Sequence, residues 1–386
     1  MRTVDLFCGC GGMSLGFEIA GFEIVGAFDN WESAVDVYNQ NFQHSAEVLD
    51  LSKKNIALAT IRPLNPEIIV GGPPCQDFSS AGERQEGERA NLTISFAKIV
   101  KNIRPNYFVM ENVSRARTSL AYAKAKELFK SAGYGITEIV LDASKCNVPQ
   151  KRKRFFCIGA LNEKDDFLRN YLLDNQSVSP LTVRKYFDEN QLSIDFDYYY
   201  RHPRTYSRRA VYSVDEPSPT VRGVNRPRPA EYNPHPNDAS VEKTITALSF
   251  RQRAIIQTFP PKFNFNASLA QIEQMIGNAV PVNLARHVAK SILAFEQQKA
   301  IVLGFENWLH EHYDFAQSTT NNIKLRVVRC NKILTIDKYN LPTYIKTFEK
   351  KEEFLTLPPL VRAKLIRALN LYFKFLISLK GKEHSG

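Results

Sequence analysis

The sequence lacks the cysteine pairs that mark disulfide-rich and zinc-binding proteins. Its six cysteines stand at positions 8, 10, 75, 146, 157 and 330, with no CxxC pair and no spacing typical of a disulfide framework. Cys8 and Cys10 are close together, but no nearby histidine or cysteine completes a set of four metal ligands. We therefore expect free thiols, the reducing cytoplasm as the compartment, and no metal site.

Long apolar runs are also missing. The most apolar late segment, residues 365–379, is too short to span a bilayer and carries Lys374 in its middle. The first residues run directly into a strand pattern and a glycine turn, so we expect no secretory leader and no membrane partner.

Acidic residues are outnumbered. The 386 residues include 51 Lys or Arg and 40 Asp or Glu, a formal net charge of +11. The surplus gathers in two stretches: residues 201–262 hold eleven basic and five acidic residues, and residues 301–386 hold fourteen and eight. A basic balance of this kind favours polyanionic partners, nucleic acid first.

Up to about residue 160, short apolar runs alternate with segments of helical periodicity, which predicts an α/β fold built on a parallel sheet. The predicted strands are residues 3–7, 22–28, 67–70, 106–110, 136–141 and 155–160. The predicted helices are residues 12–21, 32–42, 92–103, 119–133 and 281–298. Apolar positions within 365–377 also have helical spacing, which indicates the packed core of a small helical module.

A glycine-rich turn follows the first predicted strand. Gly9, Gly11 and Gly12 would let the backbone turn tightly and let a ligand approach it closely. Asp29 lies twenty residues after Gly9, where an acidic residue accepts hydrogen bonds from ribose hydroxyls. The spacing is not that of a dinucleotide site, and no Walker lysine follows, so a compact adenosyl ligand fits better. The alternative is a turn that serves only the chain reversal.

Cys75 follows a buried-strand pattern that ends in two glycines and two prolines, "IIVGGPPCQDFSS". Sites in parallel sheets form at the carboxyl ends of strands, and Pro73 and Pro74 restrict the backbone before the thiol. A deprotonated thiol is a strong nucleophile. The alternative is a buried cysteine that acts as a small hydrophobe, but its polar neighbours argue against that.

Two further segments offer partners for such a thiol. Glu111 ends the apolar run "NYFVMEN" and could serve as a general acid, or could simply cap the strand. Arg152 and Arg154 stand two residues apart, so in a strand they would point to one face and converge on an anion or a carbonyl. The alternative for these arginines is a solvated basic run.

The ordered set "DLFCGCGGMSLGFE", "GGPPCQDFSSAG", "ENV", "QKRKRF" and "IGNAVP" resembles the cytosine-5 DNA methyltransferases, over residues 2 to about 296. The resemblance implies a Rossmann-like, S-adenosylmethionine-dependent methyltransferase sheet with a smaller recognition domain and a C-terminal helical extension. It divides the chain into a catalytic and cofactor-binding domain (1–160), a target-recognition region (161–276), a returning helix (277–298) and a basic extension (299–386).

The resemblance also implies a mechanism. Cys75 would add to C6 of a cytosine flipped out of duplex DNA, Glu111 would act at N3, and Arg154, with Arg152 nearby, would contact O2 and orient the acid. Gln76 and Ser79 match loop positions that close over the DNA. The cofactor would contact Phe7, Gly9, Cys10, Gly12, Asp29 (ribose), Asn30, Asp50 (adenine), Leu51, Pro74, Leu92, Asn278 and Val280. Asn30 falls where relatives often carry an aromatic residue, and Trp31 is one residue on.

Residues 198–211 mix tyrosines with Arg201, Arg204, Arg208 and Arg209, which suits phosphate contact and groove packing. Inward-packed tyrosines in a folded turn are the alternative. We expect the C-terminal extension to help recognise DNA, because the internal recognition region is short for this family. We further expect a monomer that protects DNA in a restriction–modification system with a separate endonuclease. A tRNA cytosine methyltransferase and a non-catalytic nucleic-acid-binding protein are the alternatives.

Overall fold

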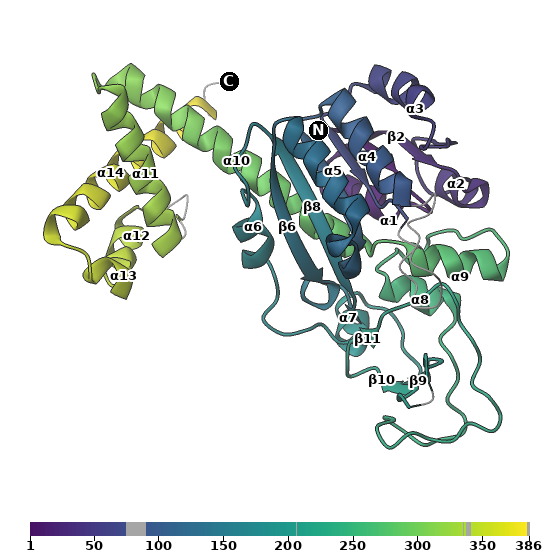
Figure 1. Cartoon of the computed structure of the whole chain (residues 1–386). Coiled ribbons are helices and arrows are strands. Elements are labelled where there is room, and N and C mark those ends of the chain that lie inside the picture. Colours follow the sequence, from purple (N-terminus) through teal and green to yellow (C-terminus); the bar gives the residue numbers. More distant parts are fainter. Residues whose placement is uncertain (75–89, 206, 335, 337–340, 384–386) are drawn as a thin grey trace. The chain divides into compact units, whose positions relative to one another are not determined.

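The computed structural model describes residues 1–74, 90–205, 207–334, 336 and 341–383. Its chain divides into two compact units, Met1–Leu293 and Ala294–Gly386 (Figure 1). The two units are described separately below. No helix in the described part is long and apolar enough to cross a membrane.

Eleven strands are present in the described residues, all of them in the first unit. They are β1 (Arg2–Leu6), β2 (Glu23–Asp29), β3 (Ala46–Val48), β4 (Ile68–Gly71), β5 (Tyr107–Val113), β6 (Tyr134–Asp142), β7 (Gln150–Lys151), β8 (Lys153–Leu161), β9 (Tyr198–Tyr200), β10 (Val211–Ser213) and β11 (Ser218–Pro219).

The α-helices are α1 (Gly12–Ile19), α2 (Glu32–Asn39), α3 (Lys54–Ile61), α4 (Ala90–Ile103), α5 (Leu120–Ser131), α6 (Arg169–Asp174), α7 (Val183–Glu189), α8 (Phe250–Ile256), α9 (Leu269–Asn278), α10 (Val282–His312), α11 (Gln317–Ile333), α12 (Leu341–Phe348), α13 (Glu352–Leu355) and α14 (Pro359–Glu383). Helix α10 continues fourteen residues beyond the predicted end at residue 298.

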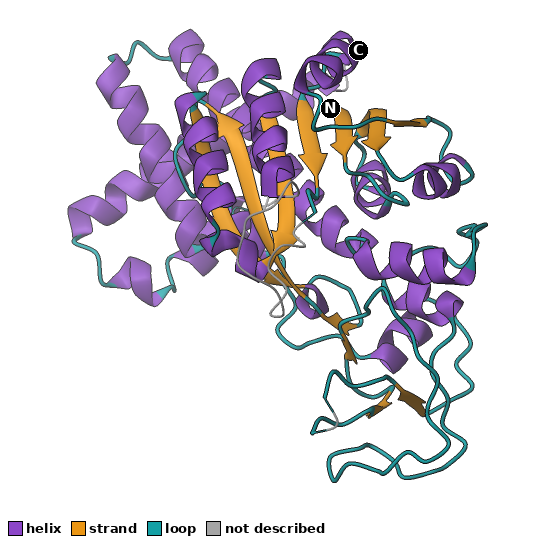
Figure 2. Cartoon of the chain, turned by 45° about the vertical axis from the view of Figure 1, so that its right-hand side comes forward, coloured by secondary structure: helices purple, strands orange, loops and turns teal. Residues whose placement is uncertain are grey.

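Seven strands form one sheet in the order β3-β2-β1-β4-β5-β8-β6. Neighbouring strands from β3 to β5 are parallel. Helices flank this sheet (Figure 2), and α3, α4 and α5 pack on it through a fully buried cluster that includes Val4, Phe96, Phe108 and Phe129. Burying each such side chain contributes on the order of 2 kcal/mol, so this cluster holds the strand ends in place. The α/β prediction is confirmed.

Strand β8 departs from the predicted parallel arrangement, because it runs antiparallel to both β5 and β6. Only the short stretch between Asp142 and Lys153 joins β6 to β8. A parallel connection needs a crossover of a dozen or more residues, usually a helix, and this stretch contains only a 3-10 turn (Ala143–Lys145) and β7. The reversal has a consequence for the site: it brings the beginning of β8 to the edge where β5 ends.

The rest of the first unit is a less regular lobe. Its antiparallel pair β9–β10 and the short parallel pair β7–β11 are accompanied by α7, α8 and α9. Tyr199, Phe259 and Ile276 are among the buried residues of its own apolar cluster. Helices α8 and α9 each begin with a capping box, at Ser249 and Ser268, which satisfies the first backbone donors of each helix.

The second unit is helical. Aromatic side chains of α10 and α14 form its core, for example Phe305, Trp308 and Phe375. The predicted apolar stripe in α14 is confirmed at Leu369 but not at Ile377, whose side chain is 65% exposed.

Candidate active site

Several predicted site residues lie at or just beyond the carboxyl ends of strands β1, β2 and β5. The order of strands changes direction between β1 and β4, and in open α/β sheets the crevice at such a point, beyond the carboxyl ends of the strands, is the usual ligand site. Strand β1 leads into Phe7 and Gly9, and β2 ends at Asp29. Strand β4 leads into Pro73, and β5 carries Glu111 near its end.

The turn after β1 has the backbone geometry that the glycines were predicted to supply. Phe7, Gly9 and Gly11 all have positive φ, at 61°, 54° and 95°. A β-carbon on Gly9 would meet no atom of the described residues within 4 Å, whereas one on Gly12 would clash with the carbonyl oxygen of Val280. Among the described residues, the turn is therefore open at Gly9 and closely packed at Gly12.

The Asp29 carboxylate braces this turn from the neighbouring strand. One of its oxygens accepts the backbone N–H of Gly9 (2.8 Å) and the other accepts that of Trp31 (2.9 Å). Burial raises the pKa of Asp29, against the effect of these hydrogen bonds. Each carboxylate oxygen can accept a further hydrogen bond, so these two contacts leave Asp29 able to accept from another donor.

The remaining residues predicted to bind the cofactor differ in their exposure to solvent. Leu51 and Val280 are buried, Pro74 and Leu92 are half-buried, and Asn30 and Asn278 are exposed. Cys10 is buried, and burial raises the pKa of its thiol to about 12. Asp50 accepts hydrogen bonds from Ser52, which lower the pKa of Asp50.

Sequence reasoning missed Asp5, which lies inside β1 just before the turn. Its side chain is 1% exposed, and its Oδ2 accepts a 2.6 Å hydrogen bond from the Ser14 hydroxyl of α1. Its Oδ1 is buried and has no hydrogen-bond partner among the described residues. Burial raises the pKa of Asp5 to about 7. Nothing in its apolar neighbourhood in the sequence, "RTVDLF", marked it as a buried carboxyl group.

Asp5 predicts a pH dependence of stability. Because its folded-state pKa exceeds the value of 3.8 expected when unfolded, the folded chain binds a proton that the unfolded chain releases. The free energy of unfolding should therefore fall as pH rises from about 4 to 7 and then level off, at up to about 1.4 kcal/mol per pH unit. Urea denaturation of wild type and Asp5→Asn at both ends of this range measures the effect. A stability difference between the two proteins that is the same at both pH values would contradict it.

The backbone that leads to Cys75 is held by β5. The Asn112 amide donates a 3.1 Å hydrogen bond to the carbonyl oxygen of Pro73. A β-carbon on Gly72 would lie 3.3 Å from Glu111 Oε2, so the two strand ends are close together. Three predicted residues, Cys75, Gln76 and Ser79, lie outside the described residues.

Glu111 and Arg154 form a largely buried ion pair. Arg154 Nε lies 2.8 Å from Glu111 Oε1, and the two side chains are 14% and 10% exposed. The pair exists because antiparallel β8 places Arg154 opposite Val113, at the end of β5. Burial raises the pKa of Glu111, while Arg154 and Arg152 act in the opposite direction. The result is an oriented carboxyl group beside the approach to Cys75.

Arg152 does not join Arg154 at the Glu111 carboxylate. It stands at the break between β7 and β8, so the alternation of a continuous strand does not apply to it. Its buried guanidinium group donates to the backbone carbonyl oxygens of Val221 (2.9 Å), Gly277 (2.9 Å) and Ala279 (3.1 Å). It therefore ties the start of β8 to the irregular lobe and to the turn after α9.

A second buried contact reinforces that connection, and sequence reasoning missed it. The Gln150 amide donates to Gln257 Oε1 (2.8 Å) and its oxygen accepts the backbone N–H of Val221 (2.9 Å). Gln257 in turn donates to the carbonyl oxygens of Ile276 and Ala279. Four segments distant in the sequence thus meet in one polar network next to Arg152.

Replacing Arg152 with alanine should destabilise the first unit strongly. The buried carbonyl groups of Val221 and Gly277 would lose this donor, while that of Ala279 would keep the hydrogen bond from Gln257. Each unsatisfied buried group costs about 1–3 kcal/mol, so we expect a loss of about 2 kcal/mol or more in the free energy of unfolding. Chemical denaturation measures this loss. The exposed neighbour Lys153→Ala is the control and should change stability by less than about 0.5 kcal/mol. Equal effects of the two substitutions would count against a structural role for Arg152.

The basic stretch 198–211 divides into inward and outward side chains. Tyr199 and Tyr200 are buried, as the inward-packing alternative predicted. Arg201 donates to the carbonyl oxygen of Thr220 (2.8 Å), and Arg209 pairs with Glu216 and lies over the ring of Tyr212. The other two arginines of this stretch, Arg204 and Arg208, are exposed.

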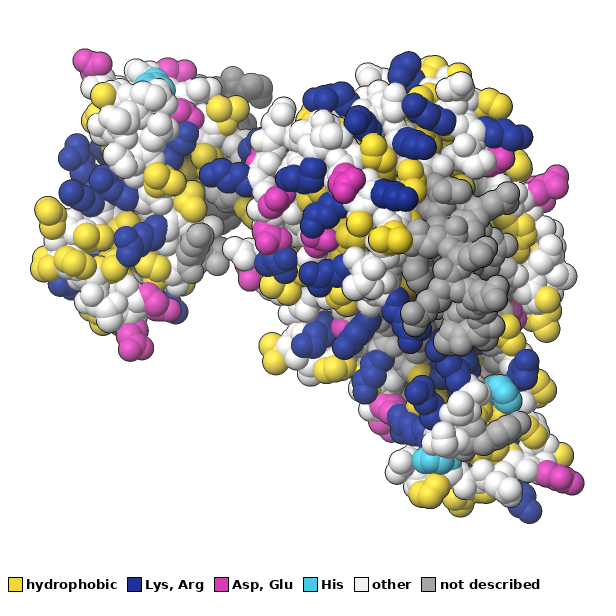
Figure 3. All heavy atoms as spheres, viewed as in Figure 1, with side chains coloured by type: hydrophobic (Ala, Val, Ile, Leu, Met, Phe, Trp, Pro, Cys, Tyr) yellow, Lys and Arg dark blue, Asp and Glu magenta, His cyan; other side chains and the backbone are white. Residues whose placement is uncertain are grey.

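Arg222 adds to this basic surface and was not singled out from the sequence. Burial, together with the positive charges of Arg201, Arg204 and Arg226, lowers the pKa of Arg222 to about 10. Lys and Arg side chains gather on the visible face of the part that holds β9, β10 and β11 (Figure 3). Several cations that repel one another across a small surface are suited to bind an anion.

The fold, the glycine turn and the oriented carboxyl group are those expected of the predicted methyltransferase. The family of C-5 cytosine-specific DNA methylases matches residues 1–294, and the chain belongs to this family. The predicted enzyme class, a DNA (cytosine-5-)-methyltransferase, and the predicted fold class are therefore confirmed.

Individual relatives agree. The chain is 54% identical to the Type II methyltransferase M.HgiDI of Herpetosiphon aurantiacus, over 77% of this chain and 96% of that protein. It is 50% identical to the Type II methyltransferase M.HindV of Haemophilus influenzae, over 79% and 100%. The crystal structure of the S. pombe Dnmt2 methyltransferase shares the fold, with a TM-score of 0.58 at 17% identity over 76% of this chain and 98% of that one.

Proposed function

We propose that the protein methylates C5 of a flipped-out cytosine in duplex DNA, using S-adenosylmethionine and a covalent adduct through Cys75. The observation that carries this proposal is the Glu111–Arg154 pair, held at the end of β5 beside the backbone that leads to Cys75. Membership of the C-5 cytosine-specific DNA methylase family supports it.

The turn after β1 fits the cofactor. In the described part of the chain, the space beside Gly9 is open to a ligand, and the Asp29 carboxylate lies next to it. When bound there, S-adenosylmethionine supplies an electrophilic methyl group on its sulfonium. Phe7, Gly9 and Asp29 would hold it, with Leu51 and Val280 as apolar walls.

The reaction needs a nucleophile and an acid. The Cys75 thiolate adds to C6 of the cytosine, and the electron pair displaced from the C5–C6 bond makes C5 nucleophilic toward a methyl group. Glu111 donates a hydrogen bond or a proton to N3 and so stabilises the charge that develops on the ring. C5 takes the methyl group and S-adenosylhomocysteine is left. Loss of the C5 proton to a base such as water, with return of any N3 proton to Glu111, then re-forms the double bond and expels the thiolate.

Arg154 has two roles in this proposal. Its contact with Glu111 fixes the direction of the carboxyl group, and its remaining N–H groups can donate to O2 of the base. Burial favours the protonated carboxyl group because it raises the pKa of Glu111. A carboxyl group with a raised pKa is better suited to donate a proton near neutral pH.

The basic lobe, within the proposed recognition region 161–276, is the expected DNA interface. A cytosine inside a duplex cannot be reached, so the base must leave the stack while the surrounding phosphates are held. Arg204 and Arg208 are exposed, and Arg222 and Arg226 add positive charge nearby.

Reversing two of these charges should weaken binding to all DNA sequences by a similar factor. In the double variant Arg204→Glu/Arg208→Glu we expect at least about a tenfold loss of affinity for DNA. The plot of log affinity against log salt concentration should also be less steep, because about two fewer counterions are released on binding. Band-shift titrations at several salt concentrations measure both quantities. Lys124→Glu, an exposed charge reversal on helix α5, is the comparison and should leave the salt slope unchanged. An unchanged salt slope in the double variant would remove these arginines from the interface.

We further propose that the enzyme is a cytoplasmic monomer and protects DNA beside a separate restriction endonuclease. The Type II methyltransferases among its relatives support the role in restriction–modification. Bisulfite sequencing of DNA from cells that express the protein should show complete methylation at cytosines of one short sequence. Purified protein should methylate duplex DNA at least about a hundredfold faster than tRNA. Methylation of tRNA alone would favour the tRNA enzyme instead.

A further inference from the structure

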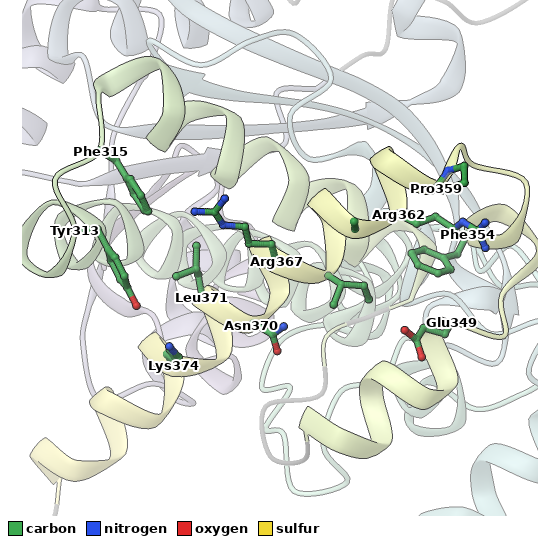
Figure 4. Close-up of a pocket in the computed structure, with 12 residues that line it drawn as sticks. Tyr313, Phe315, Glu349, Phe354, Pro359, Arg362, Arg367, Asn370, Leu371 and Lys374 are labelled. Atoms are coloured by element: carbon green, nitrogen blue, oxygen red, sulfur yellow. The ribbon is translucent and has the colours of Figure 1, made fainter.

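A groove of about 790 Å³ opens in the second unit (Figure 4). Helix α14 forms one wall along much of its length. Tyr313 and Phe315, from the corner between α10 and α11, stand at one end of the groove. Glu349 and Phe354, from the α12–α13 region, stand at the other.

The groove has the dimensions of a helix-binding site. The lining residues of α14 run from Pro359 to Lys374 and recur every three or four positions, so they belong to one face of the helix. At about 1.5 Å per residue this face is about 22 Å long, which accommodates roughly four turns of a second helix.

The floor of the groove is apolar. Phe354 and Leu371 are buried within it, and Phe315 and Ile366 are half-buried. The rings of Tyr313 and Phe315 stack at 5.1 Å and extend this apolar surface to the end of the groove. A concave apolar face of this kind is typical of proteins that bind the apolar side of an amphipathic helix.

The margin of the groove is basic. Arg367 and Lys374 are exposed, and Glu349 is the one acidic residue among the described residues that line it. Arg362 Nε is buried and has no hydrogen-bond partner among the described residues. A carboxylate that approached this wall would be attracted by the positive charges of Arg362, Arg367 and Lys374.

We propose that this groove binds an acidic amphipathic helix of a partner protein. Duplex DNA matches the basic margin, but its outer surface of phosphates and sugars would leave the aromatic floor in contact with water. A second copy of the chain matches poorly, since residues 301–386 hold fourteen basic and eight acidic residues. The sequence had led us to expect DNA as the ligand of this extension; the apolar floor favours a protein helix.

Such binding goes beyond methyl transfer. The family match ends at residue 294, and the alignments with M.HgiDI and M.HindV cover 96% and 100% of those proteins but only 77% and 79% of this chain. The groove therefore belongs to a unit that these relatives do not share. Its occupation should leave methylation by the first unit unchanged.

A peptide titration on the full-length protein tests the proposal. The probe is a fluorescein-labelled helix of about sixteen residues, with leucine at every third or fourth position and glutamate on both flanks. We expect saturable binding that weakens at least about tenfold in Arg367→Glu, because a like charge then faces the peptide. Lys364→Glu is the matched control: it is exposed on the same helix, outside the groove, and should change affinity less than about twofold.

Three other results would contradict binding of an amphipathic helix in the groove. A peptide of the same composition, scrambled so that no apolar face remains, should bind at least tenfold more weakly; equal binding would reduce the interaction to charge alone and overturn the proposal. Displacement of the peptide by a short DNA duplex would assign the groove to DNA. A dimer in light scattering that Arg367→Glu dissociates would assign it to a second copy. In every variant the methylation rate should equal that of wild type.

Discussion

Replacing Cys75 with serine should abolish methyl transfer, with a loss on the order of 10⁴ or more in the single-turnover rate. A serine hydroxyl is ionised far less readily than a thiol, so the nucleophile that adds to C6 would be missing. Serine is nearly the same size, and we therefore expect affinity for a cognate duplex within about twofold of wild type. Rapid-quench methylation and a band-shift titration at one salt concentration measure the two quantities.

The control for this substitution is a cysteine far from the reaction. Cys330 is buried in the second unit, outside the residues that match the methylase family. Cys330→Ala should keep a normal rate of methylation. A Cys75→Ser protein that retained more than about one hundredth of the wild-type rate would show that the thiol is not the nucleophile.

Glu111→Gln should produce the second largest effect, a fall of about 10²–10⁴ in kcat/KM. Glutamine keeps the shape of the side chain but cannot donate a proton, and it leaves Arg154 without its carboxylate partner. Glu138→Gln is the matched control, because Glu138 also forms an ion pair, with Lys126, but on strand β6. A Glu111→Gln rate within tenfold of wild type, or equal losses in the two variants, would contradict an acid role.

The pH profile gives an independent check on Glu111. Burial raises the pKa of this carboxyl group, so the protonated form persists to higher pH than for an exposed glutamate. If Glu111 donates its proton in the reaction, kcat should fall as pH rises through this raised pKa, and the fall should be missing in Glu111→Gln. A wild-type profile that is flat over this range would mean that Glu111 acts only as an ionised hydrogen-bond partner.

Most of the sheet could be predicted from periodicity because buried strands such as β4 are continuously apolar and end at glycine. The glycine turn was predictable for a similar reason, since its positive φ at Gly9 and Gly11 restricts the residues that can stand there. The direction of β8 was not predictable from its own residues, because an apolar strand reads the same in either direction. The missing crossover helix between Asp142 and Lys153 was the available signal.

Site residues could be predicted where a sequence motif indicated their chemistry. They could not be predicted where the role of a residue depends on contacts with distant parts of the chain. Glu111 and Arg154 were proposed as neighbours, and the register of β5 and β8 brings them together. Arg152 was grouped with Arg154 by spacing, but its partners are carbonyl groups about 70 and 125 residues away. Asp5 looked like part of an apolar strand, and only its burial beside Ser14 distinguishes it.

The most direct test of the proposed chemistry is covalent trapping with a duplex that carries 5-fluorocytosine at the target position. Fluorine at C5 prevents the final loss of a proton, so the adduct should accumulate when S-adenosylmethionine is present. Mass spectrometry of the digested complex should then locate the nucleotide on the peptide that contains Cys75. A methylation-competent preparation that yields no adduct, or an adduct on another cysteine, would contradict the assignment of Cys75 as the nucleophile.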